Sequence, residues 1–248
     1  TIRRTDGTTQ TIGFVGEEID ESAIETFCTG STCTVQVWHD QSQTGGTGSG
    51  NDAEQTTPAN QPTIYTGGAI VKDGGRVALT STGSTSLRFT RISDINSVFS
   101  VLRPTDFTSN SNSFILGDTN SYDYHSGNSG WLAAPASAVV RNGANYLNGT
   151  SVALALARSA GQYVLSMIHT SNTARANTIS QDRNGQYGQR SWIGNRQEII
   201  IYSDDRTNQR TDIEGNISAY YQSAKLLDES YGCLLYTSPS PRDRQKSR

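Results

Sequence analysis

Ser86-Leu-Arg-Phe89 and Ser97-Val-Phe-Ser-Val-Leu102 are the runs that indicate the fold class most clearly. Both runs are short, carry aliphatic and aromatic side chains, and are preceded by Thr or Asn, which is typical of β-strands. Similar runs lie on both sides, and they are Thr63–Tyr65, Arg76–Leu79, Ser113–Leu116, Ala138–Arg141, Ser151–Ala157, Tyr163–His169 and Gln197–Tyr202. About ten short strands joined by Gly, Asn, Asp and Ser turns predict an all-β sandwich or jelly roll.

The N-terminal part continues this pattern and adds a short helix. Asp6-Gly7 is a hairpin turn signal, and Cys33–Trp38 alternates apolar and polar residues like a strand. Between them, Asp20–Phe27 is a helix candidate with Asp20 or Ser22 as its N-cap.

A second helix is expected after the last strand. Asp204 or Asp205 can cap it. Its apolar residues recur at helical spacing, and they are Ile213, Ile217, Tyr220 and Tyr221. Because no stretch alternates strands with helices, a doubly wound α/β fold is not expected.

Composition agrees with an all-β domain and argues against two classes of function. Of the 248 residues, 33% are hydrophobic and 17% are charged, below the soluble averages of about 45–50% and 25%. The formal net charge of −3 argues against a nucleic-acid partner. No run approaches the roughly 18 apolar residues of a membrane span, so none is expected.

The two ends of the sequence indicate a fragment followed by a foreign tail. The chain starts at Thr1 inside a strand-like segment, which indicates an N-terminally incomplete fragment, with other domains of a longer chain as candidate partners. Cys233–Asp243 is what a transposon-type sequencing adapter would encode, and a natural Pro-rich tail is the alternative. We therefore expect one jelly-roll domain over residues 1–232 and a disordered, translated adapter over residues 233–248. Without that tail, 16 Lys and Arg face 22 Asp and Glu, a net charge of −6.

The two remaining cysteines, Cys28 and Cys33, lie close together in sequence. Two cysteines are too few for a tetrahedral zinc site, and no His follows at a ligand spacing. A short-loop disulfide is the preferred interpretation, and two buried thiols are the alternative. A disulfide predicts an oxidising location, either extracellular after secretion or on the surface of a virion.

Several motifs resemble one group of known proteins. Trp38-His-Asp-Gln-Ser42, Gly50-Asn-Asp-Ala-Glu-Gln55 and Asn60-Gln-Pro-Thr63 resemble concanavalin A-like, laminin-G-like jelly rolls, which are common in bacterial secreted proteins and phage structural proteins. Ile12-Gly-Phe14 and the cysteine pair are similar to the N-terminal part of the α-L-arabinofuranosidase B catalytic domain, in which that pair is bridged. The resemblance implies a concanavalin A-like jelly-roll sandwich.

The same resemblance implies glycoside hydrolysis, but the chain departs from the catalytic motifs. A retaining glycosidase needs two carboxyl groups about 5–5.5 Å apart. Arg141-Asn142-Gly143 stands where the family has a nucleophilic Glu before Asn-Gly, and the family's paired adjacent cysteines are missing. If the chain is an enzyme, Asp182 and Glu198 are the candidate catalytic residues. Glu198 can equally be a structural residue of the last strand.

A polar, aromatic loop is the candidate binding site. Tyr and Trp can stack on sugar rings, while Asp and Asn can bind hydroxyl groups, and loops on a β scaffold commonly carry binding. The candidate carbohydrate-binding residues are Asp118, Asn120, Tyr122, Asp123, Tyr124, His125 and Trp131. The same oxygen-rich set could hold Ca²⁺ as a cofactor, and an ordinary polar loop is a third interpretation.

Two functional hypotheses follow. The preferred one is a non-catalytic glycan-binding or structural jelly roll of a secreted or phage structural protein, with a polysaccharide or cell-surface glycan as its partner. The alternative is a divergent α-L-arabinofuranosidase-like glycoside hydrolase acting on arabinose-containing polysaccharide. The departures at the catalytic motifs favour the binding module.

Overall fold

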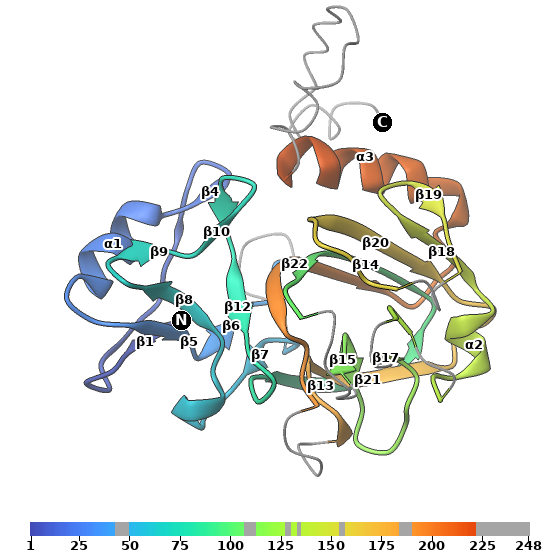
Figure 1. The fold of residues 1–248 in the computed structure, drawn as a ribbon, viewed down its shortest axis with the longest axis horizontal. Coiled ribbons are helices and arrows are strands. Elements are labelled where there is room, and N and C mark those ends of the chain that lie inside the picture. The colour runs from blue at the N-terminus through green and yellow to red at the C-terminus, as the bar shows by residue number, and fades with distance from the viewer. Residues whose placement is uncertain are drawn as a thin grey trace, which may run out of the picture.

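The computed structural model describes residues 1–42, 50–106, 113–126, 130–132, 135–153, 157–183 and 190–221. Within them, antiparallel strands form two main sheets whose side chains share one hydrophobic core, and a helix lies over the larger sheet (Figure 1). The predicted all-β sandwich with a short N-terminal helix and a closing helix is confirmed. The predicted domain boundary at residue 232 and the segment 233–248 lie outside the described residues.

The larger sheet has eleven strands and runs from one end of the molecule to the other. Its order is β19 (Thr150–Ser151), β18 (Ala144–Leu147), β20 (Tyr163–Ile168), β14 (Ser97–Pro104), β22 (Gly194–Tyr202), β12 (Leu79–Ser81), β8 (Thr63–Thr66), β5 (Cys33–Val35), β1 (Ile2–Arg4) and β2 (Thr9–Gln10), with β9 (Ala69–Ile70) paired to β8.

The smaller sheet has five strands, in the order β16 (Leu116–Gly117), β21 (Ala174–Ile179), β13 (Leu87–Ile95), β7 (Ala53–Glu54) and β6 (Val37–Trp38). Three two-stranded ribbons complete the described strands. They are β3 (Phe14–Val15) with β4 (Glu18–Ile19), β10 (Lys72–Asp73) with β11 (Arg76–Val77), and β15 (Ser113–Phe114) with β17 (His125–Ser126).

Strand β14 is buried almost throughout because both of its faces are covered. Val98 and Leu102 face the core between the sheets, whereas Phe99 and Val101 belong to a second cluster on the outer face. Helix α3 (Arg210–Tyr221) covers that outer face and contributes the buried Ile217. Each such side chain stabilises the fold by about 1.5–3 kcal/mol relative to full exposure.

Helix α1 (Glu21–Cys28) forms as the sequence predicts. The Asp20 side chain accepts a hydrogen bond from the N–H of Ala23 at 2.9 Å, which satisfies an otherwise unpaired donor of the first turn. The helix ends in a turn where Gly30 has a φ of +75°. A disulfide between Cys28 and Cys33 then ties the end of α1 to β5, so the predicted bridge is confirmed.

The strand predicted at Ala138–Arg141 is wrong, because these residues form the helical turn α2. The N–H of Arg141 donates to the carbonyl of Ser137 at 3.0 Å. The apolar pair Val139-Val140 is too short to reveal a period, so strand and helix cannot be distinguished there. Conversely, β21 was not predicted, because its interior positions are the small residues Ala174 and Ala176.

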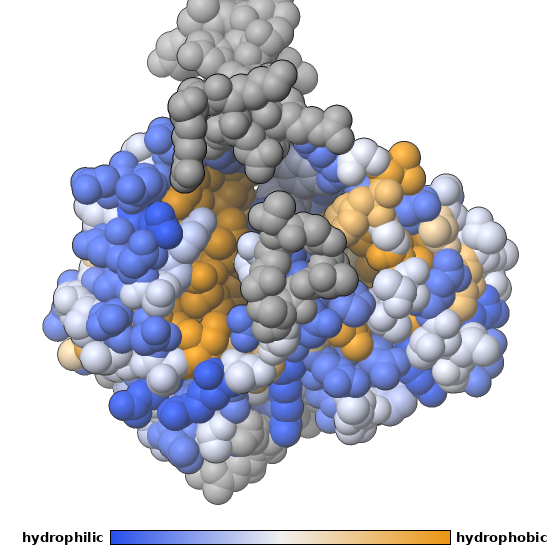
Figure 2. Space-filling view, turned by 180° about the vertical axis from the view of Figure 1, so that it is seen from behind, coloured by the Kyte–Doolittle hydropathy of each residue, from blue (hydrophilic) through white to orange (hydrophobic). Residues whose placement is uncertain are grey.

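The low hydrophobic content is concentrated in the interior. Seen from behind, much of the surface is hydrophilic, and the hydrophobic colour gathers in a recessed vertical strip and in a patch at the upper right (Figure 2). Among the large apolar side chains of the described residues, the exposed ones are Phe14, Val15 and Tyr122. None of the described helices combines the length and hydrophobicity needed to cross a bilayer.

Candidate functional site

The candidate sugar-binding loop joins β16 to β17, and Asp118 holds it in shape. The Asp118 carboxylate is buried and accepts hydrogen bonds from Arg91 at 2.6 and 2.9 Å and from the N–H groups of Asn120 and Ser121 at 3.1 Å. Burial raises the pKa of this carboxyl, but the hydrogen bonds and charge of Arg91 outweigh burial and lower it overall. Asp118 is therefore a structural residue, whose buried carboxylate fixes the conformation of the loop.

Asp123 and Tyr124 fasten the other half of the loop. A carboxylate oxygen of Asp123 accepts hydrogen bonds from the Ser121 hydroxyl and from the N–H of Arg175 in β21, both at 2.9 Å. Tyr124 is buried, and its hydroxyl lies 3.5 Å from Nε2 of His169. Burial lowers the pKa of His169 to about 4, so this histidine is neutral at physiological pH.

Tyr122 is the aromatic side chain that this loop presents to solvent, with 41% of its surface exposed. The guanidinium of Arg183 lies over its ring, 4.2 Å from the centroid, and donates a hydrogen bond to its hydroxyl. A cation over an aromatic face is attracted by the ring quadrupole, so the two side chains hold each other in place. Asn120 is exposed in the same loop.

Asp182, a candidate catalytic residue, lies directly behind this pair. Its carboxylate is fully buried and forms ion pairs with Arg183 at 2.9 Å and with Arg190 at 3.2 Å. The structure thus brings Asp182 and Tyr122 together through Arg183. We call Tyr122, Asp182, Arg183 and Arg190 the Tyr122 patch.

His125 connects the patch to the interior. It is buried, and its ring packs edge-on against Phe114 with centroids 4.8 Å apart. Desolvation lowers its pKa, and the charge of Asp182 opposes this shift. Its Nδ1 has no hydrogen-bond partner among the described residues.

Trp131 lies in the core instead of on the patch. It is 1% exposed, stacks on Trp192 with centroids 6.0 Å apart, and packs edge-on against Tyr163. Both tryptophans therefore pack in the interior of the sandwich.

Glu198, the other candidate catalytic residue, has different surroundings from Asp182. It lies on β22 beside Tyr221 of α3, and burial raises the pKa of its carboxyl while the hydrogen bond with Tyr221 opposes that rise. Asp182 is surrounded by the two arginines of the patch. No contact links the two carboxylates in the part of the chain that the structure describes.

Arg141 ends α2, far along the chain from either carboxylate. Its side chain is exposed, and its Nε donates to the carbonyl of Ala136 at 2.7 Å. The following Gly143 lies so close to Ile168 that a Cβ would meet its carbonyl oxygen at 2.2 Å. Glycine is therefore required at this position because the backbone of Ile168 approaches it closely.

Arg183 and Arg190 were not among the predicted site residues. Both lie in the Gly- and Asn-rich region after β21, and only the burial of Asp182 shows why two arginines are needed there. Within the described residues, no three His, Cys, Asp or Glu side chains form a group that could hold a metal ion.

Comparison with solved structures identifies the fold class as the concanavalin A-like β-sandwich. One similar structure is a mutant of a GH54 α-L-arabinofuranosidase soaked with 4-nitrophenyl α-L-arabinofuranoside, with a TM-score of 0.54 and 16% identity. Another is an arabinofuranosidase complexed with arabinofuranosyl-α-1,2-xylobiose, with a TM-score of 0.52 and 18% identity. The resemblance to the arabinofuranosidase catalytic domain is therefore confirmed at the level of the fold.

Each match covers 89% of this chain but 58% of the solved one, so the chain spans less than two thirds of these relatives. No protein-family model matches the chain, and no curated protein sequence is significantly similar to it. At such low identity the similarity defines the fold, and function has to be argued from the site.

Proposed function

We propose that this chain is a non-catalytic glycan-binding module for arabinose-containing polysaccharide, and that the Tyr122 patch contacts the sugar. The observation that carries the proposal is the exposed ring of Tyr122, which Arg183 holds in place. Arg183 covers one face of the ring, so the opposite face is the one that would offer apolar contact to a sugar, while guanidinium groups donate to sugar oxygens. The arabinose ligands named for the two similar structures support this choice of sugar.

The surroundings of the candidate carboxylates support binding without hydrolysis. A retaining mechanism needs a nucleophile and an acid/base that face one another. Asp182 has both oxygens occupied by arginines, and Glu198 belongs to the β22–α3 contact. The two arginines stabilise the negative charge of the Asp182 carboxylate, which makes it a weaker nucleophile.

The disulfide supports a location in an oxidising compartment, either extracellular or on a virion. We propose that the module anchors a secreted or phage structural protein to a glycan. The partner is then a polysaccharide or a cell-surface glycan.

The binding test compares Tyr122→Ala with Phe14→Ala, a matched control at another exposed aromatic residue. Binding to arabinoxylan is measured by affinity electrophoresis. Loss of the ring removes the main apolar contact, so Tyr122→Ala should bind about tenfold more weakly, whereas Phe14→Ala should bind like the wild type. Equal binding by all three proteins would contradict the assignment of the patch.

A divergent arabinofuranosidase-like hydrolase is the second candidate, because the raised pKa of Glu198 suits a general acid. The wild type is incubated with 4-nitrophenyl α-L-arabinofuranoside, and release of 4-nitrophenol is followed. No turnover is expected. Turnover that is lost in both Asp182→Asn and Glu198→Gln would replace the binding proposal with the hydrolase.

A further inference from the structure

Arg196 is a buried arginine in the middle of the sandwich, and a β-bulge explains how it came to face inward. It is 1% exposed and lies on β22. Glu198 pairs with Val101 of β14, but Arg196 pairs with Leu102, so Gln197 is an extra residue on β22. One inserted residue reverses the faces of a strand beyond it, which turns Arg196 toward the core instead of α3.

The hydrogen-bond partners of Arg196 are all uncharged. Its guanidinium donates to the Ser100 hydroxyl at 3.1 Å, to the carbonyl of Ile115 at 2.9 Å and to the Ser180 hydroxyl at 3.3 Å. Its Nε has no partner in the described part of the chain. Burial alone lowers the pKa of Arg196 to about 9, so the group is still charged at neutral pH.

An unpaired charge of this kind is unusual within this protein. The buried carboxylates of Asp73, Asp118 and Asp182 each form an ion pair with arginine. Arg196 contacts no carboxylate among the described residues. An unpaired charge in a protein core is strongly destabilising. A bound anion from outside the chain would remove this destabilisation by pairing with the guanidinium.

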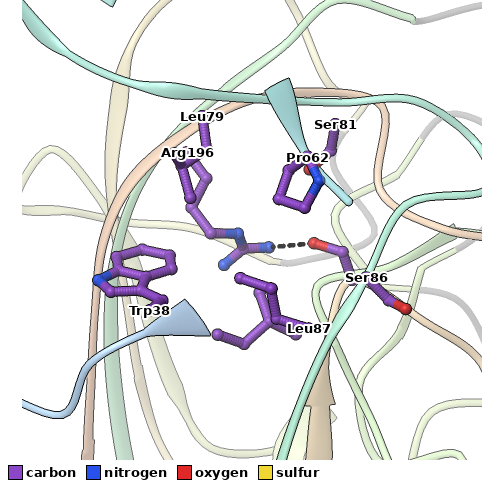
Figure 3. A pocket seen from close by; sticks show the side chains of 9 residues that line it. Trp38, Pro62, Leu79, Ser81, Ser86, Leu87 and Arg196 are labelled. Carbon is purple, nitrogen blue, oxygen red and sulfur yellow. Dashed lines mark hydrogen bonds between the residues drawn. The ribbon is translucent and has the colours of Figure 1, made fainter. Parts of the chain in front are cut away.

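A small cavity adjoins the guanidinium. Its volume is about 10 Å³, and Trp38, Leu79 and Leu87 form apolar parts of its wall (Figure 3). The hydroxyl-bearing residues Ser81 and Ser180 also line it. Ser180 has a φ of +69°, a left-handed conformation that is costly for a residue with a Cβ and is often retained for function.

We propose that this cavity binds a single halide ion, chloride in nature, with Arg196 as its charge partner. The guanidinium supplies the positive charge, and the hydroxyls of Ser81 and Ser180 supply donors. The small cavity suits a monatomic ion, because phosphate, sulfate and carboxylates carry several oxygen atoms that its largely apolar wall would leave without partners. The ion is structural, and the inference does not depend on the proposed glycan site.

Bromide tests the site directly on the unaltered chain. The full-length protein is crystallised in sodium bromide, and anomalous diffraction is recorded at the bromine edge. An anomalous peak in the cavity beside the guanidinium of Arg196 is expected. Bromide peaks at the surface alone, with a water molecule in the cavity, would overturn the proposal.

Thermal unfolding provides an independent measurement. Sodium chloride is exchanged for sodium gluconate at constant ionic strength, because gluconate is too large for the cavity. Above the dissociation constant, each tenfold rise in chloride should raise the Tm by about 3–5 °C. A Tm that follows ionic strength but not chloride would contradict a specific site.

Two arginine variants test whether the rise in Tm with chloride depends on Arg196. Arg196→Met removes the charge but keeps much of the volume, so the chloride response should disappear. Arg141→Met is the matched control at an exposed arginine, and it should respond like the wild type. A chloride response that persists in Arg196→Met would overturn the proposal. If that variant does not fold, the bromide experiment on the wild type decides.

Discussion

At the residue scale, Asp118 and Arg91 form an ion pair in which the carboxylate is buried and the guanidinium is partly exposed. Since Asp118 also accepts two backbone N–H groups, its charge stabilises the whole β16–β17 loop. Asp118→Asn should destabilise the protein by about 2 kcal/mol at pH 7. Urea unfolding measures this difference, and Asp94→Asn, at an exposed position of β13, is the control.

The pH dependence of that difference follows from the sign of the pKa shift. The pKa of Asp118 is lower in the folded than in the unfolded protein. Its contribution is therefore fully present above the unfolded value and is lost as the pH falls through the folded value. The gap between wild type and Asp118→Asn should close in acid, and a constant gap from pH 7 to pH 2 would contradict the ion-pair explanation.

The pKa shift of Glu198 has the opposite sign to that of Asp118. Burial raises the pKa of its carboxyl, so ionisation costs the folded state stability as the pH rises from the unfolded pKa to the folded one. Glu198→Gln removes that cost and should raise the Tm at pH 7 more than at pH 4. Thermal unfolding at both pH values measures the change. A Tm that falls equally at both values would indicate that the charged carboxylate stabilises the β22–α3 contact.

At the scale of elements, the disulfide joins α1 to β5 across a short loop. The two cysteines are separated by 5 positions, and a loop this small stabilises the fold by about 2 kcal/mol at most. Cys28→Ala combined with Cys33→Ala should lower stability by about that amount, as measured by urea unfolding. A reducing agent should weaken the wild type similarly and leave the double variant unchanged. A larger loss in the variant than on reduction would reveal a packing defect.

Helix α3 shows why an element can be predicted while its contacts cannot. Its apolar spacing is visible in the sequence, and Ile217 is buried as that spacing implies. The sequence does not reveal that α3 covers β14 and β20, which are distant along the chain. The same limit applies to Tyr122 and Arg183, which lie 61 positions apart and meet only because β16 pairs with β21.

At the scale of the whole molecule, the domain prediction can be tested by truncation. Helix α3, described over Arg210–Tyr221, completes the outer cluster of the sandwich. A chain ending at Gly232 should therefore have the same Tm as the full-length chain, and calorimetry provides the comparison. A Tm lower by several degrees would show that residues 233–248 belong to the folded domain.

Local sequence patterns were enough to predict the class of the fold, the short capped helix at Asp20, and the strands around Val98 and Leu165. These features depend on local patterns of apolar, polar and turn residues, which act over a few positions. The placement of the candidate site residues was decided only by the tertiary structure, which buries Asp118 and Trp131, exposes Tyr122 and surrounds Asp182 with arginines. Likewise, the bulge at Gln197 turned Arg196 inward, because burial depends on register and long-range packing that local sequence does not encode.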